Sequence, residues 1–161
     1  MITLSYYHNY GVPSRVIASS NVYGPSDPNL SRIIPNTIVR LAKGEPALLF
    51  EGAAEYIREF VYVEDVACAF ITAARKGKSG EVYCCGGTEH LSMIDLVIHI
   101  CELMGKDPNK DIKLYQKSRY FKEIEKQYID STKLRSIGWV PKTTLSDGLK
   151  KAIEYYSKKA K

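Results

Sequence analysis

The 161-residue chain lacks the features that mark several classes of protein. No apolar run approaches the ~20 residues that a helix needs to cross a bilayer, so we expect no membrane partner. The first eight residues have neither the basic region nor the long apolar region of a secretory signal, which favours a cytoplasmic protein. Hydrophobic residues make up 45% and charged residues 25% of the chain, and these proportions exclude collagen-like, coiled-coil and disordered proteins.

Cysteine and excess positive charge are also scarce. We expect reduced thiols and no metal site, because no Cys-x-x-Cys pair occurs among Cys68, Cys84, Cys85 and Cys101. The net charge is only +5, and much of the excess lies in the lysines of residues 150–161. A nucleic-acid-binding face usually has a denser basic stripe with interleaved aromatic residues. We therefore expect no nucleic-acid partner.

The chain has no self-sufficient catalytic signature. It contains no Gly-x-Gly-x-x-Gly dinucleotide-binding turn, and Thr72 stands where a phosphate-binding loop ending in Gly77-Lys78-Ser79 would need its first glycine. A Tyr-x-x-x-Lys pair, Tyr155 and Lys159, lies among solvated lysines and is interpreted as coincidental. His99 lies in an apolar segment and is interpreted as structural. We assign no catalytic residue.

Short apolar runs alternate with amphipathic stretches between glycine and proline residues. The pattern predicts the tail of a helix up to His8, strands at 14–19, 47–50, 60–63 and 81–85, and a loop at 21–28. It predicts further helices at 31–43, 66–75, after Ser92 and along 145–156, with Asp65 and Ser92 as N-caps and Gly44 as a C-terminal stop. Alternating strands and helices indicate the α/β class.

Polar side chains follow the predicted strands, which is where α/β proteins bind ligands. Five groups of motifs occur in order along nearly the whole chain: SNVYGP at 20–25, REFVYVEDV at 58–66, GEVYCCGG at 80–87, IDSTKL at 129–134, and GWVPK at 138–142 with LSDGL at 145–149. Together they resemble the C-terminal half of an extended short-chain dehydrogenase/reductase, of the NAD-dependent nucleotide-sugar epimerase and dehydratase kind. Within that family, DPNLSRIIP at 27–35 and EIEKQY at 123–128 are most similar to CDP-glucose 4,6-dehydratase, whereas the loop at 52–58 is closer in length to heptose 6-epimerases.

The resemblance implies an α/β fold that is the C-terminal part of a Rossmann-type enzyme. The last strands of the parallel sheet and the small substrate-binding domain would be present, and the N-terminal dinucleotide-binding part would be missing. Residues 1–28 would end the cofactor-domain region, and residues 29–161 would form mainly the nucleotide-sugar-binding domain. Residues 81–87 would return to the main sheet.

The resemblance also implies which residues hold the substrate, a nucleotide-diphosphate sugar. Arg58 would grip the diphosphate, for which the guanidinium is well suited because it can donate two parallel hydrogen bonds. The alternative for Arg58 is a surface ion pair with Glu55 or Glu59. Asn21 would donate its amide to a phosphate or sugar oxygen, and the alternative is that it only forms a turn.

Further residues are carried over from the family in the same way. Asn29 and Arg32 flank the start of a helix that lies over the nucleotide in relatives, and a cation at a helix N-terminus is unfavourable without a nearby anion. Arg119 and Glu123 match a late arginine and acidic residue that meet the nucleotide, with a solvated pair as the alternative. Ser19 and Ser20 would lie near the nicotinamide of NAD.

Two departures from the family concern single positions, and a third concerns the whole cofactor half. Ala18 stands where the family usually has arginine, and Cys84 where it often has a nucleotide-contacting asparagine. The cofactor glycines and the Tyr-x-x-x-Lys base of the family would lie before Met1. We therefore expect that the chain cannot catalyse the family reaction alone and that NAD does not bind to it alone.

The sequence leaves three hypotheses open. The first is the nucleotide-sugar-binding portion of an NAD-dependent epimerase or 4,6-dehydratase, with a separate N-terminal half as one source of the missing groups. The second is a stand-alone sugar-nucleotide-binding or regulatory module, and the third is a structural remnant that pairs with another chain. A strand edge near Val16 and Ile17 without sheet neighbours favours a homo-oligomer.

Overall fold

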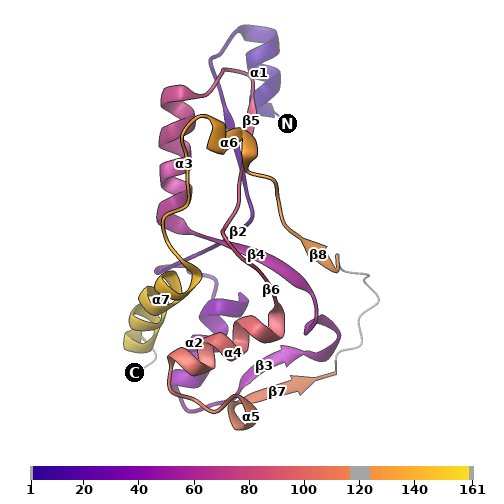
Figure 1. Cartoon of the computed structure of the whole chain (residues 1–161), viewed down its shortest axis with the longest axis vertical. Helices are drawn as coiled ribbons and strands as arrows, with labels where there is room; N and C mark the ends of the chain where they lie inside the picture. The colour runs from indigo at the N-terminus through magenta and orange to yellow at the C-terminus, as the bar shows by residue number, and fades with distance from the viewer. Residues whose placement is uncertain (1, 117–123, 160–161) are drawn as a thin grey trace. The chain divides into compact units, whose positions relative to one another are not determined.

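The computed structural model describes residues 2–116 and 124–159 (Figure 1). The chain divides into two compact units, each made of three separate stretches. Unit 1 comprises Met1–Val22, Glu59–Glu89 and Tyr128–Leu145, whereas unit 2 comprises Tyr23–Arg58, His90–Gln127 and Ser146–Lys161. Helices and strands occur in both units. The α/β class is confirmed.

Unit 1 contains a pair of parallel strands, β1 (Val16–Ser19) and β5 (Val82–Cys85). Their register places Val16 opposite Val82 and Ser19 opposite Cys85. Both strands were predicted from the sequence, and their parallel pairing places the carboxyl ends of two segments that are distant in the sequence side by side.

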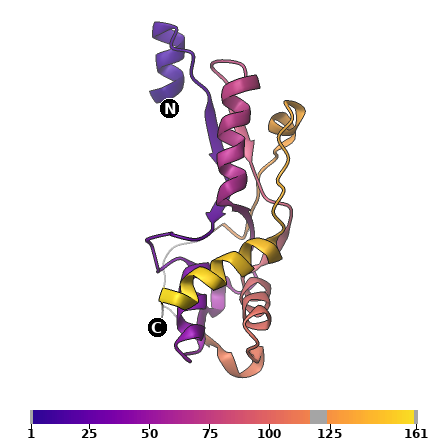
Figure 2. The same cartoon turned by 90° about the vertical axis from the view of Figure 1, so that its left-hand side faces the viewer.

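Three helices accompany these strands. Helix α3 (Val63–Lys76) packs along both β1 and β5 (Figure 2), and α6 (Thr132–Ser136) packs on β5. Helix α1 (Ile2–Tyr10) contributes no buried residue. The core of the unit forms where one face of α3 meets the strands and the segment after α6; it contains Val61, Val66, Ala69, Ala73, Tyr83, Cys85, Leu134 and Trp139.

Asp65 lies in the first turn of α3 and is not its N-cap, so that prediction is wrong. The helix begins at Val63 after the extended residue Tyr62, which makes no side-chain capping bond. The buried Asp65 carboxylate instead accepts hydrogen bonds of 3.0 Å from the backbone amides of Lys142 and Thr143. A partner so far along the chain cannot be found from local sequence pattern.

Unit 2 is built around a second pair of parallel strands, β3 (Ala47–Phe50) and β7 (Ile112–Tyr115). Helices α2 (Ile33–Ala42) and α4 (Met93–Leu103) pack against each other and against β3. The short elements η1 (Glu51–Ala53) and α5 (Pro108–Asp111) lie between β3 and β7 in the sequence, and α7 (Leu145–Lys159) is the last helix. The fully buried apolar residues of this unit include Ile38, Leu41, Leu96, Ile100 and Leu149.

The predicted ends of two helices in unit 2 are confirmed. Ser92 is the N-cap of α4, and its hydroxyl accepts a hydrogen bond of 3.1 Å from the Asp95 amide. Gly44 follows α2 with φ of +76°, a left-handed conformation that glycine adopts without strain.

A third sheet has the strand order β2 (Asn21–Tyr23), β4 (Ile57–Tyr62), β6 (His90–Ser92), and β8 (Lys126–Gln127) pairs in parallel with β4. Strand β4 belongs to both units, because the boundary falls after Arg58. The prediction of a loop over 21–28 is wrong for residues 21–23, which form β2. Within the described ranges, no helix has both the length and the apolar character of a membrane span.

The thiols of the chain differ in accessibility. Burial raises the pKa of the Cys85 thiol to about 12 and that of the Cys101 thiol to about 11, whereas Cys68 is exposed. Because the thiolate is the reactive form, we expect iodoacetamide at mildly alkaline pH to alkylate Cys68 in the folded chain and the two buried thiols only after unfolding. Peptide mass spectrometry after timed quenching measures this order, and equal rates for Cys68 and Cys85 would contradict it.

Candidate functional site

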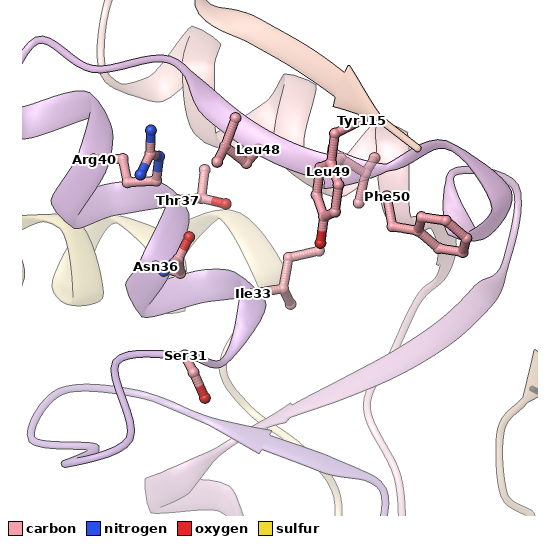
Figure 3. A pocket seen from close by; sticks show the side chains of 9 residues that line it. All are labelled: Ser31, Ile33, Asn36, Thr37, Arg40, Leu48, Leu49, Phe50 and Tyr115. Carbon is pink, nitrogen blue, oxygen red and sulfur yellow. The ribbon is translucent and has the colours of Figure 1, made fainter. Parts of the chain in front are cut away.

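A cavity of about 410 Å³ lies within unit 2 between helix α2 and strand β3 (Figure 3). The side formed by α2 and the residues before it is largely polar, and the strand side is apolar and aromatic. Its lining residues are Ser31, Ile33, Asn36, Thr37 and Arg40 on the first side and Leu48, Leu49, Phe50 and Tyr115 on the second. The Phe50 and Tyr115 rings lie with centroids 6.1 Å apart at the ends of neighbouring strands.

The polar side of the cavity is held by contacts within unit 2. The Arg40 guanidinium donates through Nε to the Pro46 carbonyl at 2.8 Å and forms an ion pair of 3.1 Å with Glu45 through Nη1. The side-chain amide of Asn36 donates to the backbone carbonyl of Leu30 at 3.1 Å. Apolar and aromatic walls with a few fixed polar groups are the usual lining of a small-molecule site.

The loop of residues 24–32, here called the rim loop, ends at this cavity and carries two of the predicted site residues. The Asn29 carboxamide oxygen accepts hydrogen bonds from the Ser31 amide at 3.1 Å and the Ser31 hydroxyl at 2.6 Å, and Ser31 lines the cavity. Arg32 is the N-cap residue of α2 and forms an ion pair of 3.4 Å with Asp27. The Arg32 side chain is still 58% exposed. The structure thus brings Asn29 and Arg32 together at the cavity rim.

Arg58, on β4, makes backbone contacts in unit 2. Its Nη1 donates to the Ile57 carbonyl at 2.9 Å and to the Glu125 carbonyl at 3.4 Å, and its guanidinium lies 5.4 Å from the centre of the Tyr56 ring. These contacts orient the side chain along the β4–β8 pair. Arg119 and Glu123 lie outside the described residues.

The other predicted residues lie in unit 1, at the ends of β1 and β2. The side-chain amide of Asn21 donates to the backbone carbonyl of Glu59 at 3.0 Å, so it joins β2 to β4. The Ser20 backbone amide donates to the Cys85 carbonyl at 3.0 Å, whereas the Ser20 hydroxyl is buried and has no hydrogen-bond partner in the part of the chain that the structure describes. Ser19, the last residue of β1, is exposed.

Three residues that were interpreted from the sequence as structural or coincidental, His99, Tyr155 and Lys159, make side-chain contacts. His99 Nε2 lies 2.7 Å from the Ser146 hydroxyl, a structural contact between α4 and α7. Tyr155 and Lys159 meet in space, with the ammonium 4.6 Å from the ring centre. Hydrogen bonds with Lys159 and with Ser26 lower the pKa of the Tyr155 hydroxyl.

Most of the residues that line the cavity were not predicted from the sequence. Arg40 and Asn36 stand four positions apart on α2, a spacing that places them on one helix face, and this was the available signal. Tyr115 could not have been connected with Phe50, because the segment that contains β7 was not predicted as a strand. Over the described ranges, no group of three or more His, Cys, Asp or Glu residues could hold a metal ion.

Comparison with known proteins decides the family. The family model described as GDP-mannose 4,6 dehydratase matches residues 1–152. The chain belongs to this family. It is a family of extended short-chain dehydrogenases/reductases whose members include nucleotide-sugar dehydratases and epimerases, as the relatives below show. The resemblance inferred from the five groups of motifs is confirmed.

Several known proteins are similar to the chain over nearly its whole length. It is 35% identical over 157 residues to the trifunctional UDP-glucose 4,6-dehydratase/UDP-4-keto-6-deoxy-D-glucose 3,5-epimerase/UDP-4-keto-L-rhamnose-reductase of Arabidopsis thaliana, a match that covers 98% of this chain and 23% of that protein. It matches dTDP-glucose 4,6-dehydratase from Bacillus anthracis, crystallised with NAD, at 30% identity and a TM-score of 0.87, covering 98% of this chain and 49% of the other. UDP-glucose 4-epimerase from Thermotoga maritima, crystallised with UDP-glucose, matches at 31% identity and a TM-score of 0.85, covering 98% and 50%.

The chain thus spans about half the length of these crystallised relatives. The fold they share with it is the Rossmann-type dehydratase fold, so the predicted fold class is confirmed. The nearer likeness to CDP-glucose 4,6-dehydratase and the roles of the individual site residues stay predictions.

Proposed function

We propose that this chain is the nucleotide-sugar-binding portion of an NAD-dependent nucleoside-diphosphate-sugar 4,6-dehydratase or epimerase. The observation that carries the proposal is the unit 2 cavity, whose rim holds Asn29 and Arg32 next to the lining residue Ser31. A volume of about 410 Å³ lies within the ~300–1,000 Å³ of small-molecule sites. UDP-glucose in the Thermotoga maritima relative supports the substrate class.

The cavity suits the nucleoside end of such a substrate. The apolar wall of Leu48 and Phe50 offers contact to the face of a base, and Asn36 and Thr37 offer polar atoms to its edge. Because Arg40 is held by Glu45 and Pro46, its guanidinium would be a fixed hydrogen-bond donor beside the base, with its charge balanced by Glu45. These residues would set the orientation of the nucleotide before any chemistry.

The diphosphate would meet the cationic residues around this cavity. Arg32 stands at the positive end of α2 beside Asp27, and its exposed guanidinium and the helix N-terminus would both attract a phosphate group. We propose that Arg58 and Arg119 add further positive charge, with Glu123 toward the nucleotide and the Asn21 amide toward a phosphate or sugar oxygen. In this assignment 29–161 is mainly the nucleotide-sugar domain, and 1–28 with 81–87 belongs to the cofactor region.

NAD supplies hydride-transfer chemistry when it is bound in this family. One feature of the chain fits a cofactor neighbour: the Ser20 hydroxyl is buried without a partner among the described residues, at the end of a parallel strand. Another does not, because the sequence has no glycine-rich turn for the pyrophosphate. We propose that Ser19 and Ser20 face the nicotinamide in a complete site, and that this chain alone neither holds NAD nor catalyses the reaction.

A partner chain would complete unit 1. The Val16 and Ser20 amides donate toward β5, at 3.0 Å each, so the amides of Ile17 and Ser19 point to the opposite edge of β1, where no described strand lies. Helix α3 also bears a second, exposed apolar stripe at i, i+4, i+7 and i+11: Val63, Ala67, Phe70 and Ala74. We propose that a second copy or a separate N-terminal half covers these groups, and sedimentation velocity tests it: a strictly monomeric, cooperatively folding chain contradicts self-association.

Calorimetric titration with UDP-, CDP-, GDP- and dTDP-sugars tests the proposed function directly. Binding of one of these without turnover in the presence of NAD supports the proposal. Turnover of a sugar nucleotide by the chain alone overturns the proposal that the catalytic groups lie outside this chain. Absence of heat with every sugar nucleotide overturns the binding role. The remaining hypothesis is then that the chain is a structural remnant that pairs with another chain.

Arg58→Ala is expected to weaken binding of the sugar nucleotide by about 1.5–3 kcal/mol, or roughly 10- to 150-fold in Kd, because a charged contact to the diphosphate is lost. Arg58→Lys should recover only part of it, since an ammonium cannot donate two parallel hydrogen bonds. Arg75→Ala, at an exposed arginine of α3, is the matched control. An unchanged Kd in a variant that keeps its circular dichroism spectrum removes Arg58 from the site.

A further inference from the structure

One tyrosine of the last helix is connected to the rim loop at two points. Tyr156 of α7 is 1% exposed, and its hydroxyl accepts a hydrogen bond of 2.9 Å from the Asp27 amide. The same hydroxyl donates to the Gly24 carbonyl at 3.0 Å. A single buried oxygen therefore holds the first residue and the middle of the rim loop.

The loop between these two points is strained. Ser26 has φ of +67°, and it is the one residue other than glycine that adopts a left-handed conformation among the described residues. Such a conformation persists only where the surrounding contacts hold it. The two hydrogen bonds of Tyr156 flank Ser26 and contribute to that constraint, together with the hydrogen bond between the Ser26 and Tyr155 side chains.

From Asp27 the hydrogen bonds continue to the cavity. The Asp27 carboxylate accepts from the Asn29 amide at 2.9 Å and forms the 3.4 Å ion pair with Arg32. Asn29 in turn accepts from Ser31, which lines the cavity. The chain of contacts thus runs from Tyr156 through Asp27 to the rim residues of the candidate site.

We propose that Tyr156 is a positioning residue, whose hydroxyl fixes the rim loop so that Asn29 and Arg32 are held ready for the nucleotide diphosphate. The inference rests on the proposed function for its ligand, but the loop geometry that it explains does not. The residue touches no substrate in this proposal. It acts through Asp27, on a loop that would otherwise relax from the Ser26 conformation.

Tyr156→Phe tests the proposal, because it removes only the hydroxyl. Hydrogen exchange at the Asp27 amide should speed up at least about five-fold, and the Kd for UDP and dTDP should rise about five- to ten-fold, as expected for the loss of one or two hydrogen bonds. The matched control is Tyr83→Phe, which removes another buried tyrosine hydroxyl, hydrogen-bonded at 2.8 Å to the Lys78 amide in unit 1. The control should lose stability but leave both readouts unchanged.

A double-variant cycle separates positioning from general stability. In an Arg32→Ala background, Tyr156→Phe should raise the Kd by a smaller factor than it does in the wild type, because one of the two residues that it positions is gone. Asp27→Ala keeps the backbone hydrogen bond to Tyr156 but removes the carboxylate that contacts Asn29 and Arg32, without altering α7. It should weaken binding as Tyr156→Phe does, and an unchanged Kd in this variant overturns the positioning role even where Tyr156→Phe does not fold.

The outcomes are distinct. A wild-type chain that binds neither UDP nor dTDP overturns the proposed function and the positioning role with it. Binding by the wild type with an unchanged Kd in Tyr156→Phe and Asp27→Ala overturns the positioning role alone. Faster exchange at Asp27 with no change in Kd shows that the hydroxyl orders the loop without serving the site, and it also overturns the proposal.

Discussion

Trp139→Ala is expected to lower the free energy of unfolding by about 3–5 kcal/mol, the range found when large aromatic side chains are removed from a core. Trp139 is 2% exposed and lies in the core cluster of unit 1 with residues of α3 and α6. Its indole N–H donates to the Asp65 carbonyl at 2.9 Å, and that bond is lost with the ring. A cavity therefore arises, and the Asp65 carbonyl loses the indole donor.

Urea denaturation followed by far-ultraviolet circular dichroism measures this effect, because Trp139 is the only tryptophan of the chain and its fluorescence disappears in the variant. Trp139→Phe is the matched control, since it keeps most of the apolar volume and loses only the N–H donor and part of the ring. It should cost clearly less than the alanine variant. A loss below about 1 kcal/mol for Trp139→Ala would be incompatible with the packing described.

Gly87→Ala is expected to destabilise the chain by about 3 kcal/mol or more, at or above the upper end of the effects of overpacking. A Cβ at this position would clash with the backbone carbonyl of Phe60, and backbone cannot move aside as a flexible side chain can. Because Phe60 lies in β4, the strand that bears Arg58, the clash should also weaken binding of the sugar nucleotide.

Gly44→Ala provides the comparison, since its Cβ would meet nothing within 4 Å and only the left-handed backbone is unfavourable, at about 1–2 kcal/mol. Thermal unfolding of the two variants and the wild type measures the difference. Equal stability losses at the two positions would show that Gly87 does not approach the Phe60 carbonyl as described.

The elements that the sequence analysis placed well are those whose signal is local. Helix α4 has an apolar face at helical spacing and a hydroxyl N-cap at Ser92, and both features act within a few residues. Asp65 shows the opposite case, because its carboxylate accepts from residues 142 and 143 rather than from the start of its own helix. Strand β2 was missed because Asn21-Val22-Tyr23 precedes Gly24-Pro25, whose turn signal outweighed three residues of strand.

The candidate site was only partly predictable for the same reason. Asn29 and Arg32 were found through a resemblance, and the structure places them at the rim of a cavity. The cavity itself depends on Phe50 and Tyr115, which lie 65 positions apart and meet only through the pairing of β3 with β7. Tyr156 likewise reaches Asp27 across 129 positions. Contacts of this kind are properties of the folded chain and leave no local pattern.

The interleaving of the two units has a practical consequence for anyone dissecting this protein. Each unit is assembled from three stretches that alternate along the chain, so no pair of backbone cuts liberates either one as a continuous polypeptide. Limited proteolysis should therefore give nicked species rather than autonomous fragments. Producing one unit by itself would require splicing its stretches with designed linkers.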